Sequence, residues 1–190
     1  MTTGVSSRPQ GLFGIIARTG TVRNVKAAGR VLVRQSSGAG LIAGENNGVL
    51  YNCEASAFLK NSYNAGSTGS SVGNIGGIAG HMAAGYIENC RAYGLFLANP
   101  ESYDEGNLVN SSMLCQIGGI VGRNQASGQI VSCSFEGKVQ GTTATGGIAG
   151  QNAGTIRHCT NSGSVNINNV DTALSLSDIQ IDMTLDLANL

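Results

Sequence analysis

Four of the five cysteines recur in one short motif and are the residues that most suggest a chemical function. Each ends a segment of the form Gly-x-(Val/Ile/Leu)-x-(Asn/Ser/His)-Cys, and the four are Cys53, Cys90, Cys133 and Cys159. Such a series could bind a soft metal ion or form disulfides, but no Cys-x-x-Cys pair is present. Thiols at equivalent positions of a repeat also point the same way instead of converging on a tetrahedral centre. We therefore predict buried free thiols, with no metal and no cofactor. A disulfide between neighbouring cysteines of the series is the alternative.

Carboxylates suggest a second chemistry, that of a polysaccharide-cleaving enzyme, which needs an acid and a base or nucleophile in fixed apposition. Four glutamates of the repeats stand at differing distances from the cysteine motif, so they form no paired row: Glu45, Glu54, Glu88 and Glu136. An acidic cluster of Glu101, Asp104 and Glu105 surrounds Tyr103 in a stretch outside the repeats. We predict that this cluster is a solvated loop, with a ligand contact or a weak cation contact as the alternative, and that the protein is not an enzyme.

The two histidines do not indicate catalysis either. His158 occupies the position that the other copies fill with Asn24, Asn52 and Asn89, which predicts a residue at a corner of the chain. His81 begins the linker after a Gly-Gly-Ile-Ala-Gly block, and neither histidine has a Cys or Ser partner that the sequence can place beside it.

These residues are positioned by an internal repeat of three blocks in five copies. The first block is glycine-rich and occupies 11–14, 40–44, 76–80, 118–122 and 146–150. The second is the motif that ends in Cys, or in Val25 in the first copy, and occupies 20–25, 48–53, 85–90, 128–133 and 154–159. The third begins four residues later, at Gly29, Ala57, Gly94, Gly137 and Gly163. Successive copies are 28, 37, 43 and 26 residues apart, so a unit of about 26 residues carries insertions in two copies.

Each block is a short run with period-two alternation between Gly, Asn and Ser, which predicts three short strands in every unit. A unit of this size cannot bury its apolar face alone, but stacked copies bury a continuous core. We therefore predict an all-β fold, a parallel and right-handed β-helix of about five coils with two inserted loops.

Composition supports this fold and excludes several partners. The chain has 29 Gly, no Trp and 5 % aromatic residues, as a narrow interior with sharp corners requires. Eleven basic and eleven acidic residues give zero net charge, so no basic footprint for nucleic acid is present. No apolar stretch approaches the ~18 residues of a membrane span, which predicts no membrane insertion.

The repeat unit resembles a known family. The segment GGIAGQNAGTIRHCTNSGSV, residues 146–165, resembles the GLUG repeat of large bacterial surface and secreted proteins, which include the N-terminal regions of immunoglobulin-A-cleaving peptidases. The first copy, GLFGIIARTGTVRNV at 11–25, is similar to a variant of the same motif. The resemblance spans about 11–167 and implies a parallel β-helix, a stalk or adhesive role, and an extracellular or cell-surface location.

The predicted organisation has three parts: a lead-in at 1–10, the repeats at 11–170 with insertions at about 61–74 and 99–116, and a tail at 171–190. No signal peptide is present, and we expect the chain to be a fragment of a longer exported protein.

The tail alternates apolar and polar residues over 172–190, which predicts a β-strand. This strand would close the last coil or lead into a neighbouring domain. Alternatively, it would pair with another chain, so that coil ends and residues 172–190 mediate self-association.

We expect a non-enzymatic bacterial cell-surface module that acts as adhesin or stalk. Its contact residues are predicted in the insertions, at Tyr63, Tyr103, Asp104 and Glu105, and its partner would be a host protein or glycan, or neighbouring domains of a longer chain. Two alternatives stay open: a self-assembling fibre subunit, and a fragment of a β-helical carbohydrate-active enzyme.

Overall fold

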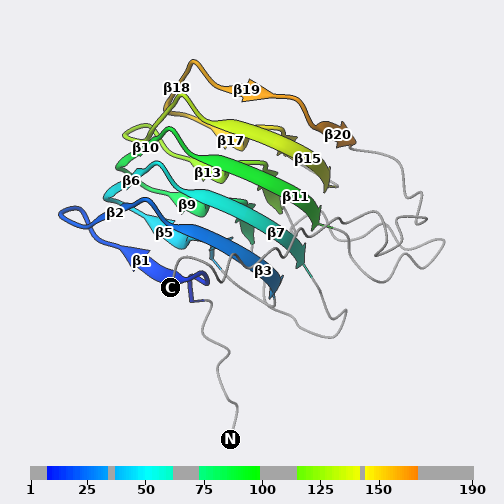
Figure 1. The fold of residues 1–190 in the computed structure, drawn as a ribbon, viewed down its shortest axis with the longest axis horizontal. Helices are drawn as coiled ribbons and strands as arrows, with labels where there is room; N and C mark the ends of the chain where they lie inside the picture. Colours follow the sequence, from blue (N-terminus) through cyan, green and yellow to red (C-terminus); the bar gives the residue numbers. More distant parts are fainter. Residues whose placement is uncertain (1–7, 34–36, 62–72, 99–114, 142–143, 167–190) are drawn as a thin grey trace, which may run out of the picture.

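The chain winds into a stack of coils in which every strand pairs in parallel with its counterpart one coil away (Figure 1). The computed structural model describes residues 8–33, 37–61, 73–98, 115–141 and 144–166. Within these ranges all regular structure is strand, arranged as five coils of a β-helix, so the predicted fold class is confirmed.

The first two sheets are built from the glycine-rich block. The strands of the first sheet are β4 (Ala39–Gly40), β8 (Asn74–Gly76), β12 (Gln116–Gly118) and β16 (Thr145–Gly146). In the first coil, Gln10 takes this place through a single parallel bridge to Ala39. The strands of the second sheet are β1 (Phe13–Ile16), β5 (Ala43–Asn46), β9 (Ala79–Met82), β13 (Val121–Asn124) and β17 (Ala149–Asn152).

The third and fourth sheets follow the remaining two blocks. The strands of the third sheet are β2 (Thr21–Arg23), β6 (Val49–Tyr51), β10 (Tyr86–Glu88), β14 (Gln129–Val131) and β18 (Thr155–Arg157). The strands of the fourth sheet are β3 (Lys26–Val33), β7 (Glu54–Asn61), β11 (Arg91–Ala98), β15 (Ser134–Gly141), β19 (Thr160–Asn161) and β20 (Ser164–Asn166).

The second, third and fourth coils thus have four strands each instead of the three predicted, because the glycine-rich block contains a corner of its own. In the third coil β8 ends at Gly76 and β9 begins at Ala79, so the chain turns at Gly77 and Ile78. Backbone hydrogen bonds between coils continue through this corner: Gly77 N donates to Gly119 O at 3.1 Å. The Gly-Gly dipeptide at 76–77 is a turn signal that the expectation of one strand per block did not use.

The interior consists of rows of aliphatic side chains that run along the stack. Ile42, Ile78 and Ile120 form one such row and are fully buried. Two larger side chains interrupt the rows, since the rings of Phe96 and Phe135 lie 5.3 Å apart between centroids. Small residues make room for them, because a Cβ at Gly119 would overlap the Phe135 ring and the carbonyl oxygen of Gly147. Most glycines are therefore needed for close approach between coils, whereas positive φ accounts for few of them.

Candidate functional site

The corner between the third and fourth sheets repeats one backbone geometry in every coil. The residue at this corner has a φ of 51° to 57°, and the five residues are Asn24, Asn52, Asn89, Ser132 and His158. This is the left-handed region, which Asn visits more readily than most residues because its side chain hydrogen-bonds locally. The interpretation of His158 as a corner residue is confirmed.

The three corner asparagines form a hydrogen-bonded row on the surface. Asn52 Nδ2 donates to Asn24 Oδ1 at 2.8 Å, and Asn89 Nδ2 donates to Asn52 Oδ1 at 3.2 Å. Each amide is thereby fixed in orientation, so the row presents amide groups to solvent at a spacing of one coil.

Substituting Asn52 tests how much this row stabilises the corner. Asn52→Ala removes both side-chain hydrogen bonds and places at positive φ a residue that adopts this conformation less readily than Asn, so we expect a loss of about 1 to 2 kcal/mol in the free energy of unfolding. Asn52→Gly removes the same bonds but accepts the φ, so its loss should be smaller. Urea denaturation of the two variants checks this, and equal losses would show that the φ of Asn52 costs nothing.

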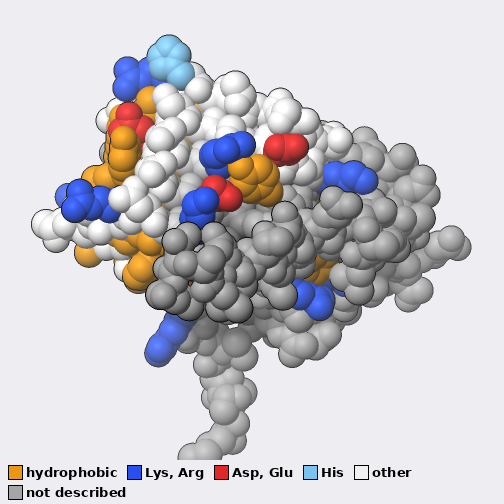
Figure 2. All heavy atoms as spheres, in the orientation of Figure 1, with side chains coloured by type: hydrophobic (Ala, Val, Ile, Leu, Met, Phe, Trp, Pro, Cys, Tyr) orange, Lys and Arg blue, Asp and Glu red, His pale blue; other side chains and the backbone are white. Residues whose placement is uncertain are grey.

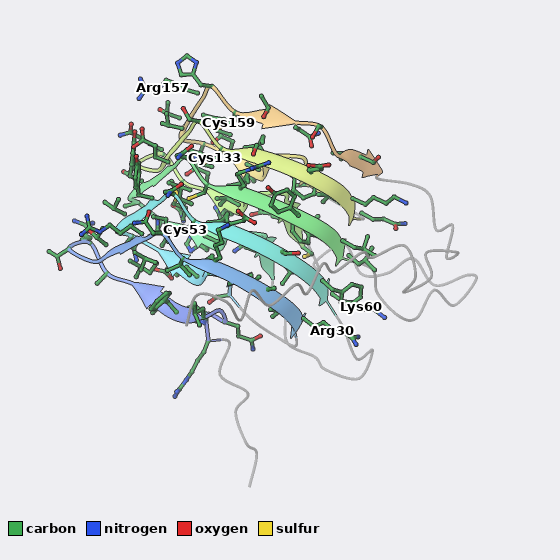
Figure 3. All side chains as sticks on the ribbon, viewed as in Figure 1. Arg30, Cys53, Lys60, Cys133, Arg157 and Cys159 are labelled. Atoms are coloured by element: carbon green, nitrogen blue, oxygen red, sulfur yellow. The ribbon has the colours of Figure 1, made fainter. Side chains whose placement is uncertain are left out.

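In the second to fifth coils the residue directly after the corner is a cysteine, and these cysteines form a row along the stack (Figure 3). The backbone N–H of Cys53 donates to Sγ of Cys90 at 3.4 Å, and that of Cys133 donates to Sγ of Cys159 at 3.4 Å. All four thiols are free, and the first three are buried. Val25 occupies the same position in the first coil and packs against the core.

Contacts between neighbouring thiols determine where the row would ionise. Hydrogen bonds from Cys159 and Cys90 lower the pKa of Cys133 to about 4, and the contact with Cys90 lowers the pKa of Cys53 to about 6. The same contacts raise the pKa of Cys90 and of Cys159. The Cys133 side chain is 1 % exposed, and its Sγ donates to the carbonyl oxygen of Val131 at 3.2 Å. Such a shielded sulfur packs the core and meets no substrate.

Outside the corner, charged side chains of three adjacent coils line up. Lys26, Glu54 and Arg91 are register partners in β3, β7 and β11, and Lys26 Nζ lies 3.6 Å from Glu54 Oε2. Together with the asparagine row they line a hollow of about 130 Å³, whose lining residues are Asn24, Lys26, Asn52, Cys53, Glu54, Asn89 and Arg91. Figure 2 shows basic and acidic side chains interspersed on this face of the molecule.

This hollow can hold one small polar group. Its volume is well below the ~300 Å³ at which drug-sized ligand sites begin, so it can accept a single substituent such as a carboxylate or an acetamido group. Amides, two cations and one carboxylate provide donors and acceptors for it, but no nucleophile is exposed there. This site was not predicted from the sequence, although each charged residue directly follows the recurring Val or Cys position.

A second polar group lies on the outer side of the second sheet. Glu45 and His81 are register partners, with Oε2 and Nδ1 3.8 Å apart, and Gln125 Nε2 lies 2.9 Å from His81 Nε2. Burial lowers the pKa of His81 and exceeds the opposite effect of Glu45, while Arg123 lowers it further. His81 is thus harder to protonate than an exposed histidine, and its ring is oriented by the hydrogen bond with Gln125.

The two insertions leave the fold at the same corner, between the fourth and first sheets. β7 ends at Asn61 and β8 begins at Asn74, while β11 ends at Ala98 and β12 begins at Gln116. Asn61 pairs with Ala98, and Asn74 pairs with Gln116, so the roots of the two insertions are neighbours in adjacent coils. The expected boundaries of 61–74 and 99–116 therefore each include a residue or two of the strands, because the repeat continues to pair until the chain departs.

The predicted contact residues Tyr63, Tyr103, Asp104 and Glu105 lie outside the described residues, as does the tail at 171–190. Cys115, by contrast, is described: it is 6 % exposed and belongs to the core directly before β12.

Two searches for other kinds of site gave no candidate in the described ranges. In this part of the chain no group of three or more His, Cys, Asp or Glu side chains could hold a metal ion. The described residues also contain no helix long and apolar enough to cross a membrane.

Comparison with protein families matches two adjacent segments, residues 114–140 and 141–166, to the GLUG motif. Each matched segment covers one coil, the fourth and the fifth, and the first three coils continue the same register. The chain therefore contains a GLUG-motif repeat region, and the resemblance drawn from its sequence is confirmed. Comparison with curated proteins and with solved structures gives no match.

Proposed function

We propose that this GLUG-motif β-helix is a non-enzymatic module of a bacterial cell-surface protein, a stalk that binds a host protein or glycan through its two insertions. The GLUG repeats support a β-helical module of surface proteins. The adhesive role of the insertions is the further step that the proposal makes.

The position of the insertion roots is the observation that carries the proposal. Asn61 and Ala98 are paired, as are Asn74 and Gln116, so both insertions depart from and return to adjacent strands. In-register parallel strands lie about 4.8 Å apart, which is close enough for two insertions to contribute to one surface. A rigid scaffold that carries adjacent loops is a common arrangement for binding.

The residue types of the insertions fit such a surface. Tyr63 lies in the first insertion, and Tyr103, Asp104 and Glu105 lie in the second. Tyrosine provides a large contact area and one hydroxyl at low entropic cost, and carboxylates accept hydrogen bonds from sugar hydroxyls or pair with basic side chains.

We also propose that this module has no catalytic activity. Glu54 is engaged by Lys26, and Glu45 by His81 and by Asn47, whose Nδ2 donates to Oε1 of Glu45 at 2.7 Å. Among the described carboxylates, these two lie on different sheets, so they do not face each other as an acid and base of a glycosidase would.

Replacing the insertions tests the proposal. In one variant residues 62–73 are replaced by Thr-Thr, the two residues 142–143 that separate Gly141 from Ala144 in the uninterrupted repeat, and in a second variant residues 99–115 are replaced in the same way, so that both variants keep the strand register. Circular dichroism shows whether each variant is folded, and glycan and host-protein arrays measure binding. We expect the intact chain to bind and either replacement to reduce binding at least about tenfold.

A matched pair of substitutions sharpens the result. Tyr103→Ala should weaken binding, whereas Tyr51→Ala, at an exposed tyrosine of the third sheet, should leave it unchanged. Binding that survives both replacements, or an intact folded chain that binds no array member, would overturn the adhesive role.

A self-assembling fibre subunit is the second candidate, because both ends of the stack expose apolar side chains. Leu12 is 60 % exposed at one end and Val165 is 39 % exposed at the other. Light scattering that rises with protein concentration would favour this candidate over a monomeric module.

A further inference from the structure

The first coil presents an unpaired strand edge with an open core. Among the described strands, β3 (Lys26–Val33) pairs with β7 alone and is the last strand of its sheet. Its inward residues Ala27 and Val31 are only partly buried, although their partners Ala55 and Leu59 in the next coil are fully buried. An edge of eight residues with free backbone donors and acceptors is a template for a further strand.

The second sheet is open at the same end. Leu12 and Phe13 are 60 % and 38 % exposed, whereas Ile42 and Ala43, which follow them along the same rows, are fully buried. In Figure 2 apolar side chains reach the surface beside basic ones at the edge where Figure 1 shows β1 and β2. This end needs a cover of apolar residues.

The charge of the first coil indicates what kind of cover fits. Residues 8–33 contain five basic side chains and no Asp or Glu: Arg8, Arg18, Arg23, Lys26 and Arg30. The last coil, residues 144–166, contains Arg157 as its one Lys or Arg and no acidic residue. The partner of the first coil should therefore be an acidic strand with one apolar face.

One segment of the chain has this composition. Residues 167–190 contain four Asp and no Lys or Arg, so the zero net charge of the chain conceals a basic first coil and an acidic tail. Along this tail Asp178, Asp182 and Asp186 recur every fourth residue on the polar side of the alternation. The other side carries Ile179, Ile181, Met183, Leu185 and Leu187.

We propose that residues 172–190 cap the first coil of their own chain by pairing as an added strand with the free edge of β3. Lys26 and Arg30 are also four residues apart on the outer face of β3, so the spacing of the aspartates matches theirs. The cap extends an existing pattern. Lys26, Glu54 and Arg91 alternate in the sign of their charge along the stack, and an Asp beside Lys26 continues this alternation. Its aliphatic side covers Ala27 and Val31.

The tail is long enough to reach this edge. Residues 167–177 can span about 36 Å when extended, whereas the added strand would lie about 24 Å from the fifth coil along the axis, at five strand spacings of about 4.8 Å. Attachment to the same chain gives the strand a high effective concentration, which favours its own first coil over that of another molecule.

Amide hydrogen exchange of β3 tests the cap. Truncation after Val170 is expected to speed exchange of β3 amides at least about tenfold and to leave those of β14 unchanged. The triple variant D178K/D182K/D186K should have the same effect without shortening the chain, and D171K is the matched control at an aspartate outside the alternation. Adding R30E to the triple variant should restore part of the protection, because a charge is then exchanged between the two strands while Lys26 keeps its contact with Glu54.

The outcomes separate the cap from its alternatives. Unchanged exchange of β3 after truncation would overturn the proposal. Protection that depends on protein concentration, together with dimers or longer species in sedimentation that the truncation abolishes, would show that the tail pairs with a second molecule instead. Array binding by the insertions does not involve the tail, so its failure would leave this result intact.

Discussion

Phe96→Ala is expected to lower the free energy of unfolding by about 3 to 5 kcal/mol. The Phe96 side chain is fully buried, and its ring lies 5.3 Å from that of Phe135 in the middle of the stack. Removing the ring leaves a cavity that the neighbouring coils cannot fill, because backbone hydrogen bonds fix their spacing. Urea denaturation followed by circular dichroism measures the loss.

A conservative variant and a double mutant provide controls for this prediction. Phe96→Leu retains most of the apolar volume and should cost less than half as much as Phe96→Ala. Phe135→Ala should be similarly destabilising, and the double-mutant cycle should give a coupling of about 0.5 to 1.5 kcal/mol for the ring pair. A loss under about 1 kcal/mol for Phe96→Ala would contradict the packing described here.

Gly137→Val has the second large expected effect, a loss of about 3 kcal/mol or more. Gly137 has a φ of 146°, and a Cβ there would overlap the carbonyl oxygen of Gly94 in the adjacent coil. A branched side chain therefore meets backbone strain and a steric overlap that neither strand can relieve without breaking its pairing.

Gly29→Ala is the matched control, because Gly29 lies in the same row of the fourth sheet. A Cβ at Gly29 would meet nothing nearer than Leu41 Cδ1 at 3.8 Å, and the second coil already has Ala57 at this position. We expect Gly29→Ala to change the thermal midpoint little and Gly137→Val to lower it by several degrees. Similar midpoints for the two variants would contradict the explanation.

Much of the fold could be predicted because a stacked repeat places equivalent residues in contact. The distances between Val25, Cys53, Cys90, Cys133 and Cys159 along the sequence give the coil lengths directly. The asparagines of the corner identified His158 as a corner residue before its φ was known, since five residues at one row position share one backbone geometry.

The sequence did not predict features that differ from coil to coil, nor the role of glycine where this residue serves both at corners and at close approaches between coils. The fourth strand was missed because the Gly-Gly dipeptide at 76–77, which can mark a turn, was interpreted as part of a single strand. The abundance of glycine was attributed to corners, although positions such as Gly119 are required by approach between coils. The hollow at Lys26, Glu54 and Arg91 was missed because its members differ in charge from coil to coil, so they do not register as a repeated motif.

The parallel pairing of coils also determines how this molecule responds to mechanical force. Hydrogen bonds between coils run along the axis, so tension on the two ends peels strands from the stack one coil at a time. A coil of 26 residues released in this way extends to about 90 Å, and one of 43 residues to about 150 Å, in place of a rise of about 4.8 Å. The insertions therefore set the length gained at each step, and release of the coil of 43 residues gives the largest gain.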